Sequence, residues 1–342
     1  MNKKILYIAA AILFLVSAII GFNYYQKIFG KTITKKGAIF IGSNYHLMDV
    51  KKILTEFTTK PEDFFYVAEK KKFTKPKAGK YVLKEGMSMN DVVNLLRSGN
   101  QTPVKISFNN QDTLEKLAGR IAEQLEIDSI TFLKVIKNPQ FLEKNNFSKK
   151  SVLGMFIPNS YEFYWNTSAE KFRDKMLREY KRFWNSDRLE KAKKLKLSQE
   201  EVITLASIVQ KETAKKIERP IVAGLYLNRL KSGWPLQADP TIIYCVKEIK
   251  GQDYVVKRVL TKDLEIKSPY NTYKNRGLPP TLIAMPDISA IDGVLNAKKH
   301  NYLYMCASVD NIGYHAFSSS LRQHNNNAAK YHFWLNKRRI NR

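Results

Sequence analysis

The sequence predicts an α+β protein with an N-terminal transmembrane helix, a small α+β module and a larger mixed α/β domain. Three observations favour this class. An uncharged apolar stretch lies close to the N-terminus. Short strand-like patterns and amphipathic helical patterns then follow one another along the chain. Hydrophobic residues make up 44% of the 342 residues, which permits a proper core and argues against disorder.

The N-terminal apolar stretch is Ile5–Phe22, and it carries no charged residue. It is just long enough to cross a bilayer and long for the apolar part of a cleaved signal. No clear small-x-small cleavage site precedes the polar residues that begin at Asn23. We therefore expect residues 1–22 to form a cytoplasmic tip and an uncleaved anchor. Lysines flank both ends of the stretch, so charge alone does not decide its orientation.

The next part of the chain predicts a short polar linker over residues 23–36 and a small α+β module over residues 37–108. Pro61 separates two of its expected helices, and Gly99 ends the third. Strands are expected at 38–41, 79–84 and 104–108, and helices at 46–57, 62–73 and 90–97.

Residues 109–197 predict a mainly helical connecting segment, with helices at 113–125, 129–136 and 169–183. The last domain, 198–342, begins with a helix over 198–213. Ser198 is a good N-cap for this helix, and Glu201 three residues later completes a capping box.

Glu212 is the most informative residue of that helix. Leu205, Ile208 and Val209 mark an apolar face, and Glu212 occupies the next position of the same stripe. Burial raises the pKa of a carboxyl group and keeps it partly protonated near neutral pH, as a proton donor requires. The alternative is a solvent-exposed side chain in the fraying last turn of the helix.

Three segments outside this helix offer further polar and aromatic groups. Asp239 before Pro240 predicts an N-cap followed by proline at the first helical position. The proline-rich stretch 268–287 predicts an ordered loop in which tyrosine and asparagine side chains either read sugar hydroxyls or lie in surface turns. The aromatic residues of 155–165 form either core or a sugar-stacking wall.

The formal net charge of +27 attracts polyanions such as nucleic acid, anionic lipid head groups or acidic wall polymers. No nucleic-acid-binding motif accompanies the charge, so we expect a solvated basic surface and no nucleic-acid partner. A membrane-anchored nucleic-acid-binding protein stays open on the charge alone. Cys245 and Cys306 have no metal-ligand spacing, and whether they pair is undecided.

Several motifs in order resemble those of the YceG-like endolytic murein transglycosylases over roughly residues 38–335. They are AGKYVLKEGMSMNDVVNLLRSGNQ, GMFIPNSYEFYWNTSAE, LASIVQKET, NRL, LQADPTIIY, SPYNTYKNRGLPP and GYHAFSSSLRQHN. Many members carry two glutamates in the helix motif, where this chain has Gln210 and Glu212. Asn159 and Ser160 also depart from the family pattern, which makes fine specificity less certain than reaction type.

The resemblance implies that residues 37–108 form a LysM-like subdomain and that 198–342 form the catalytic domain. It implies catalysis by Glu212 without cofactor or metal. Candidate substrate-binding residues are Asn228, Gln237, Asp239, Tyr270, Asn271 and Tyr273. It also implies a single-pass protein of the inner (cytoplasmic) membrane with its catalytic domain outside the cytoplasm. Its expected partners are peptidoglycan glycan strands and peptidoglycan synthases.

The expected reaction follows from the number of carboxylates. A glycoside hydrolase normally needs two, whereas a lytic transglycosylase needs one. Glu212 would protonate the oxygen that leaves C1 of N-acetylmuramic acid and then accept the proton of the C6 hydroxyl that attacks C1, giving a 1,6-anhydro end. Such cleavage within nascent strands would end glycan elongation. A catalytically inactive, membrane-anchored peptidoglycan-binding adaptor is the alternative.

Overall fold

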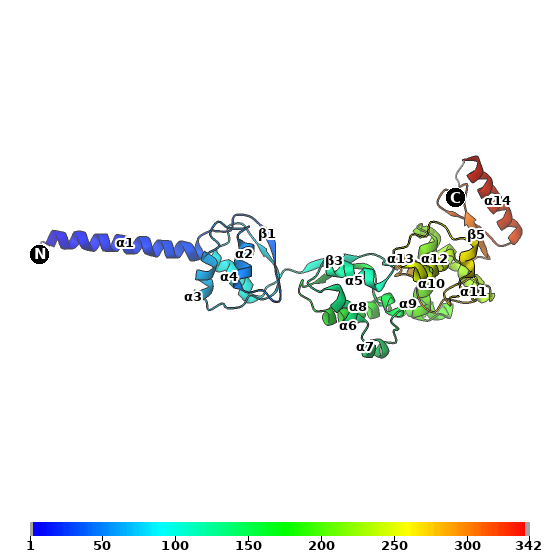
Figure 1. The fold of residues 1–342 in the computed structure, drawn as a ribbon, viewed down its shortest axis with the longest axis horizontal. Helices are drawn as coiled ribbons and strands as arrows, with labels where there is room; N and C mark the ends of the chain where they lie inside the picture. The colour runs from blue at the N-terminus through cyan, green and yellow to red at the C-terminus, as the bar shows by residue number, and fades with distance from the viewer. Residues whose placement is uncertain (1–2, 339–342) are drawn as a thin grey trace. The chain divides into compact units, whose positions relative to one another are not determined.

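The computed structural model describes residues 3–338, so the predicted domain ends at residues 1 and 342 lie outside the described residues (Figure 1). The chain forms two compact units. The first runs up to Ile106 and includes Ile121–Asp128 and Tyr161–Ser168. The second contains Ser107–Arg120, Ser129–Ser160 and the chain from Ala169 onward. The prediction of mixed helix and strand with an N-terminal apolar helix is confirmed.

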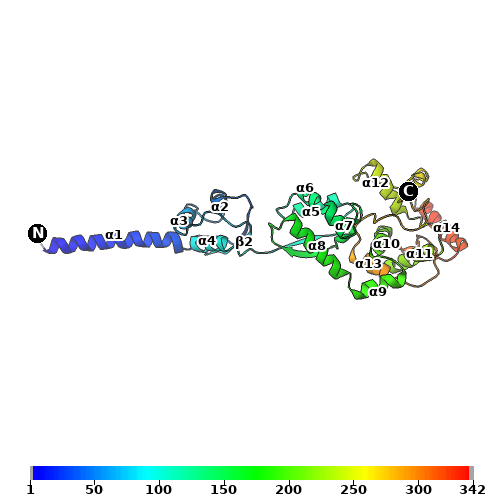
Figure 2. The same cartoon turned by 90° about the horizontal axis from the view of Figure 1, so that it is seen from below.

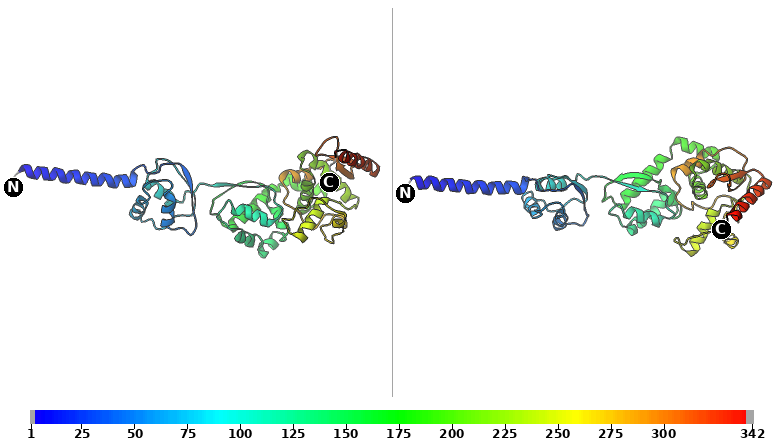
Figure 3. Two further views of the ribbon diagram at one scale, coloured as in Figure 1. Left: turned by 45° about the horizontal axis from the view of Figure 1, so that its top comes forward. Right: turned by 90° about the horizontal axis from the view of Figure 1, so that it is seen from above.

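The N-terminal helix α1 covers Lys3–Phe29, and among the described helices it alone is long and apolar enough to cross a membrane. A signal sequence at this position would meet the same criteria. The helix continues through the first half of the expected linker 23–36 without a break (Figure 3). Its last turns pack on the first unit, where Tyr24 stacks on Tyr66 with ring centroids 5.8 Å apart and Ile28 contacts the core.

The first unit is built around an antiparallel pair of strands, β1 (Gly37–Ile41) and β2 (Gly79–Leu83), in which Gly37 faces Leu83. Alternate residues of β2 are buried, as expected for a strand with one face on a core. The helices that supply the rest of this core are α2 (Leu47–Leu54), α3 (Asp63–Lys70) and α4 (Met89–Ser98). A capping box at Ser88 begins α4, and Gly99 in the left-handed conformation ends it.

The middle of the chain is mostly helical. Its strands β3 (Val104–Phe108) and β4 (Asn159–Phe163) form a second two-stranded sheet. Aromatic rings of α6, α8 and the turn before β4 pack together, with Phe132 and Phe172 at a centroid distance of 5.4 Å. The helices are α5 (Leu114–Ala122), α6 (Ser129–Ile136), α7 (Pro139–Lys144), α8 (Ala169–Phe183) and α9 (Ser186–Leu195), with a short 3₁₀ turn at Ser151–Met155.

The C-terminal part is organised around α10 (Gln199–Glu212), which is buried at every position from Val202 to Gln210. A helix that is buried on all sides is the centre of its domain. Figure 2 shows α10 beside α11 (Arg219–Lys231) and α13 (Ile288–Leu295). The remaining elements are α12 (Asp239–Lys250), the antiparallel strands β5 (Tyr304–Ala307) and β6 (His315–Ser318), α14 (Leu321–Lys337), and 3₁₀ turns at Lys216–Glu218 and Thr261–Glu265.

Candidate active site

The site begins where α10 ends. Ser198 caps the helix as predicted: its Oγ accepts a hydrogen bond from the Glu201 amide at 3.1 Å, and its own amide donates to Glu201 Oε2 at 2.7 Å. Thr213 is extended, with φ −135° and ψ 131°, so Glu212 is the last helical residue. Its side chain reaches a cavity of about 240 Å³.

This cavity is shared by α10, α11, α12, the loop after residue 268 and both strands of the C-terminal hairpin. Leu225 and Leu236 supply much of its apolar wall, and Cys306 of β5 also lies on it. Cys306 and the buried Cys245 are both free thiols. The polar and charged side chains on the cavity are Glu212, Tyr226, Arg229, Gln237, Asp239, Tyr273 and His315.

Glu212 has the protonation behaviour expected of an acid catalyst. Burial raises its pKa to about 6. The charge of His315, the hydrogen bond from Tyr226 and the charge of Arg229 work in the opposite direction, while Asp239 raises the pKa further. The Tyr226 hydroxyl donates to Glu212 Oε2 at 3.1 Å. Since the pKa lies close to neutral pH, the same carboxyl group can both donate and accept a proton.

Asp239 is a second carboxylate on the same cavity. It was expected to cap α12, and this prediction is wrong: Ala238 is the N-cap, and Asp239 is the first helical residue. The helix begins one residue earlier than expected, so Asp239 lies within the first turn and its carboxylate does not cap the backbone amides of that turn. Instead, it accepts a hydrogen bond from the Tyr273 hydroxyl at 2.5 Å. Burial, together with Asp239, raises the pKa of Tyr273, which therefore stays a donor.

Arg229 fixes the wall between α11 and the start of α12. Its guanidinium donates to the carbonyl oxygens of Leu303 at 2.7 Å and Leu236 at 2.6 Å. A longer contact of 3.5 Å reaches Gln237 Oε1, and Gln237 itself has a left-handed backbone with φ 49°. The cavity therefore holds a buried cation whose hydrogen bonds go mainly to backbone.

Three of the predicted substrate-binding residues serve the surrounding structure, and none of them is among the described residues that line the cavity. Asn228 donates to the carbonyls of His300 at 2.8 Å and Tyr302 at 3.0 Å. Asn271 is fully buried and donates to the carbonyls of Leu264 and Ile266. Tyr270 packs against Tyr244 in a tilted arrangement, with ring centroids 4.6 Å apart, and its hydroxyl shares a hydrogen bond with the Thr281 hydroxyl. The two asparagines bind backbone carbonyls, and the tyrosine packs against α12. Glu212, Gln237, Asp239 and Tyr273 are thus the predicted residues that meet on the cavity.

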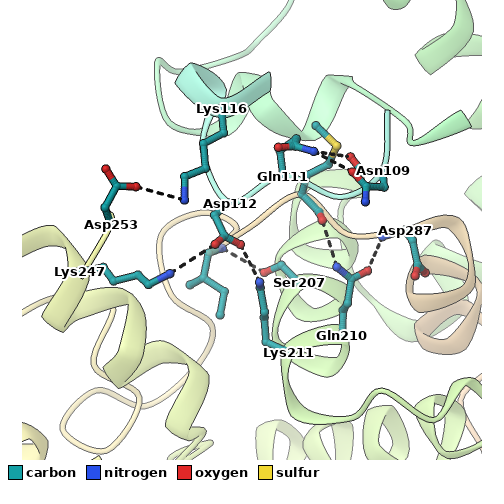
Figure 4. Close-up of polar contacts among 12 residues, drawn as sticks. Asn109, Gln111, Asp112, Lys116, Ser207, Gln210, Lys211, Lys247, Asp253 and Asp287 are labelled. Atoms are coloured by element: carbon teal, nitrogen blue, oxygen red, sulfur yellow. Dashed lines mark hydrogen bonds and ion pairs between the residues drawn. The ribbon is translucent and has the colours of Figure 1, made fainter. Parts of the chain in front are cut away.

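Side chains of α10 hold the segment 283–287 against the helix (Figure 4). Ser207 Oγ accepts from the Ile283 amide at 3.0 Å. Gln210 donates to the Met285 carbonyl at 3.2 Å and accepts from the Asp287 amide at 2.5 Å. Because the side-chain amide of Gln210 both donates and accepts a hydrogen bond here, it holds this segment in place and does not face the cavity.

Asp112 connects the two helices whose ends carry Glu212 and Asp239 (Figure 4). Its carboxylate contacts Lys211 of α10 at 2.6 Å and Lys247 of α12 at 3.4 Å. Burial raises the pKa of Asp112, but the hydrogen bonds and charges of these two lysines outweigh it and the net pKa is lowered. The ionised carboxylate therefore helps to set the spacing of α10 and α12.

The arrangement can carry out acid and base chemistry on a bound ether or acetal oxygen. It combines one carboxyl group of raised pKa, hydroxyl donors and the buried guanidinium of Arg229. Three residues on the cavity were not among the predicted site residues: Tyr226, Arg229 and His315. The last two stand in the motifs NRL and GYHAF, which were quoted without a role for these residues.

Comparison with known proteins identifies relatives over most of the chain. The model of the YceG-like family matches residues 39–330. An endolytic murein transglycosylase of Bacillus subtilis (strain 168) is 33% identical over 270 residues, which are 74% of this chain and 72% of that protein. A Streptococcus pneumoniae serotype 2 protein of the same name is 30% identical over 294 residues, and the chain covers only 53% of its length. A crystal structure of a yceG-like protein from Listeria monocytogenes has a TM-score of 0.58 and 28% identity, covering 85% of this chain and 98% of that one.

Proposed function

This chain belongs to the YceG-like family, and we propose that it is an endolytic lytic transglycosylase that cleaves the MurNAc-β-1,4-GlcNAc bond within peptidoglycan strands. The observation that carries the proposal is the position of Glu212 on a polar cavity with its pKa raised to about 6. A carboxyl group in this state is a competent acid towards the glycosidic oxygen, which is only weakly basic.

The reaction proceeds by two proton transfers through one side chain. Glu212 donates its proton to the oxygen that links C1 of N-acetylmuramic acid to the next sugar, and the C1–O bond breaks. The C6 hydroxyl of the same muramic acid then attacks C1 and gives its proton to the Glu212 carboxylate. A 1,6-anhydro bond forms, the acid is regenerated and no water is consumed. Attack by a hydroxyl of the same sugar residue gains from proximity.

The other polar groups of the cavity would bind and orient the sugar. Tyr226 keeps Glu212 Oε2 in place through its 3.1 Å hydrogen bond. Asp239, Gln237 and Tyr273 offer acceptors and donors for hydroxyl and acetamido groups. Because Tyr273 donates to Asp239, that carboxylate has a positioned partner and a fixed orientation. Asp239 is also the group that would activate water if the enzyme were a hydrolase.

The cellular setting is part of the same proposal. Helix α1 would anchor the protein in the cytoplasmic membrane, with the two units outside the cytoplasm. Residues 37–108 would act as a LysM-like module that contacts glycan, and the strands would be nascent ones supplied by peptidoglycan synthases. Support comes from the apolar character of α1 and from the enzyme names of the relatives.

The products of purified glycan strands test the reaction. If Glu212 works alone, the new ends should resist borohydride and weigh one water less than hydrolysis products. Mainly reducible ends would identify a hydrolase and assign the base role to Asp239. Anhydro ends found only at pre-existing termini would support the transglycosylase reaction but contradict cleavage within the strands.

A further inference from the structure

Glu218 is a buried carboxylate that the proposed reaction does not use. It lies in the 3₁₀ turn before α11 and is only 3% exposed. A buried carboxylate is costly unless its oxygens are hydrogen-bonded. Glu218 meets this requirement with three donors: the His315 amide on Oε1 at 2.7 Å, His315 Nδ1 on Oε2 at 3.2 Å and Thr213 Oγ1 on Oε2 at 2.8 Å.

These contacts join two sides of the cavity. Thr213 directly follows Glu212 at the end of α10, and His315 is the first residue of β6. Glu218 therefore holds the residue next to the proposed acid and a residue of the opposing hairpin at the same time. Backbone and ring of His315 bind different oxygens of one carboxylate, which fixes the orientation of the ring.

One of the two ring nitrogens of His315, Nε2, is available to bind a ligand. Because a carboxylate only accepts hydrogen bonds, Nδ1 carries the hydrogen that points to Glu218. Nε2 has no hydrogen-bond partner among the residues that the structure describes, and the ring lies on the same cavity as Glu212. When the ring is protonated, Nε2–H is a donor and the ring carries a positive charge.

We propose that Glu218 and His315 form a positioning pair that places a positive charge and an N–H donor beside the carboxyl group of Glu212. The inference rests on the proposed function, since it gives the pair a role in the reaction of Glu212. After the first proton transfer Glu212 is a carboxylate, and a nearby cation stabilises that state. When the ring is protonated, its Nε2–H donates to an oxygen of the bound sugar.

The direction of the effect depends on all the charges that face Glu212. Tyr226 and Arg229 of α11 and His315 of β6 lower its pKa, whereas burial and Asp239 of α12 raise it. Tyr273 contacts Asp239 and adds a hydroxyl. When the His315 charge is removed, one of the effects that lower the pKa of Glu212 is lost. Burial and Asp239 still raise this pKa, so it increases. The protonated acid then persists to higher pH but donates its proton less readily.

The test is the pH dependence of kcat/KM for His315→Gln in the full chain, with glycan strands as substrate. The pH at which kcat/KM falls on the alkaline side of the profile (its alkaline limb) should rise by about one pH unit. The maximal kcat/KM (the plateau) should fall by about tenfold. His332→Gln, a substitution of an exposed histidine on α14, is the control and should leave the profile unchanged. A plateau that falls without movement of the limb would mean that His315 has only a structural role, and would overturn the proposal.

A double-mutant cycle tests the role of Glu218. Glu218→Gln keeps an acceptor for Thr213 but removes the negative charge that holds the imidazole. It should move the limb in the same direction, and adding it to His315→Gln should cause little further change, because the two residues act as a unit. Additive shifts would contradict the pair, and circular dichroism of each variant checks folding. Wild-type protein that forms no anhydro ends would reject the proposed function, whereas an unmoved limb with normal products rejects only this inference.

Discussion

Glu212 and Gln210 show how differently two neighbouring polar residues of one helix are used. Gln210 is the more buried, and both ends of its amide bind the backbone of residues 285 and 287. Glu212 is the last helical residue, and it faces a cavity. The apolar stripe singled out Glu212, but α10 is buried on all sides, so the stripe by itself does not separate the two. Their difference comes from where the helix ends.

The first prediction concerns the acid itself. Glu212→Gln should leave the fold intact, because the amide is nearly isosteric and Tyr226 can still donate to its oxygen. Activity should fall by about 10²–10⁴-fold, because an amide neither donates nor accepts the catalytic proton. Rates on purified strands and a circular dichroism spectrum check both statements. Retention of more than about a tenth of the wild-type rate would exclude this residue as the acid.

The second prediction uses the hydroxyl of Tyr226. In Tyr226→Phe the ring still fills its buried site, but Glu212 Oε2 loses its donor. That hydrogen bond favours the ionised form and lowers the pKa of Glu212, so its loss raises the pKa above about 6. Loss of activity on raising the pH should therefore occur at higher pH than in the wild type. A limb that moves to lower pH would show that Tyr226 does not hydrogen-bond the carboxylate.

Contacts between side chains and groups far apart in the sequence could not be predicted from the sequence. Arg229 binds backbone of residues 236 and 303, and Glu218 binds His315 almost one hundred positions away. No local periodicity encodes such pairs, because they depend on how the hairpin folds back on α11. Asn271 shows the reverse error: a polar loop residue that suggests sugar binding is fully buried and holds loop carbonyls.

At the scale of elements, strongly amphipathic helices were predictable. The ranges 129–136 and 169–183 coincide with α6 and α8, because the spacing of their apolar residues is helical. Helix α14 was not predicted, since its three consecutive asparagines have poor helix propensity. Strands β5 and β6 were missed as well. They are four residues long, and all their residues are half-buried except the buried Ser318, so they lack the alternation that marks a strand.

The third prediction concerns the ion pairs that link α10 and α12. Asp112→Asn should lower stability by about 1 kcal/mol, because Lys211 and Lys247 lose a shared partner that is partly solvent-exposed. The pKa of Asp112 is lowered in the folded state, so its contribution is present above the unfolded pKa of about 3.9 and is lost as the pH falls below it. Melting temperatures of wild type and variant should thus differ at about pH 7 and converge as the pH falls through the lowered folded-state pKa of Asp112. A constant difference would assign the effect to packing.

At the scale of the whole molecule, the fourth prediction concerns topology. If α1 is an uncleaved anchor, the mature protein should retain its N-terminal residues and sediment with membranes. Protease added to spheroplasts should digest the two units. Intact-mass measurement of the purified protein checks the first statement and immunoblotting checks the second. Full protection in intact spheroplasts would reverse the orientation, and a shortened N-terminus would identify a cleaved signal.

The union of α1 with the first unit has a mechanical consequence. Tyr24 stacks on Tyr66, and Ile28 contacts the core, so the helix and the unit have no swivel between them. The 18 uncharged residues of Ile5–Phe22 measure about 27 Å, slightly less than a hydrocarbon layer of about 30 Å, so a spanning α1 has little length to spare for tilting. Any tilt of the anchor would turn the first unit through the same angle. If α1 spans a membrane, the thickness of the bilayer would therefore influence the orientation of the first unit.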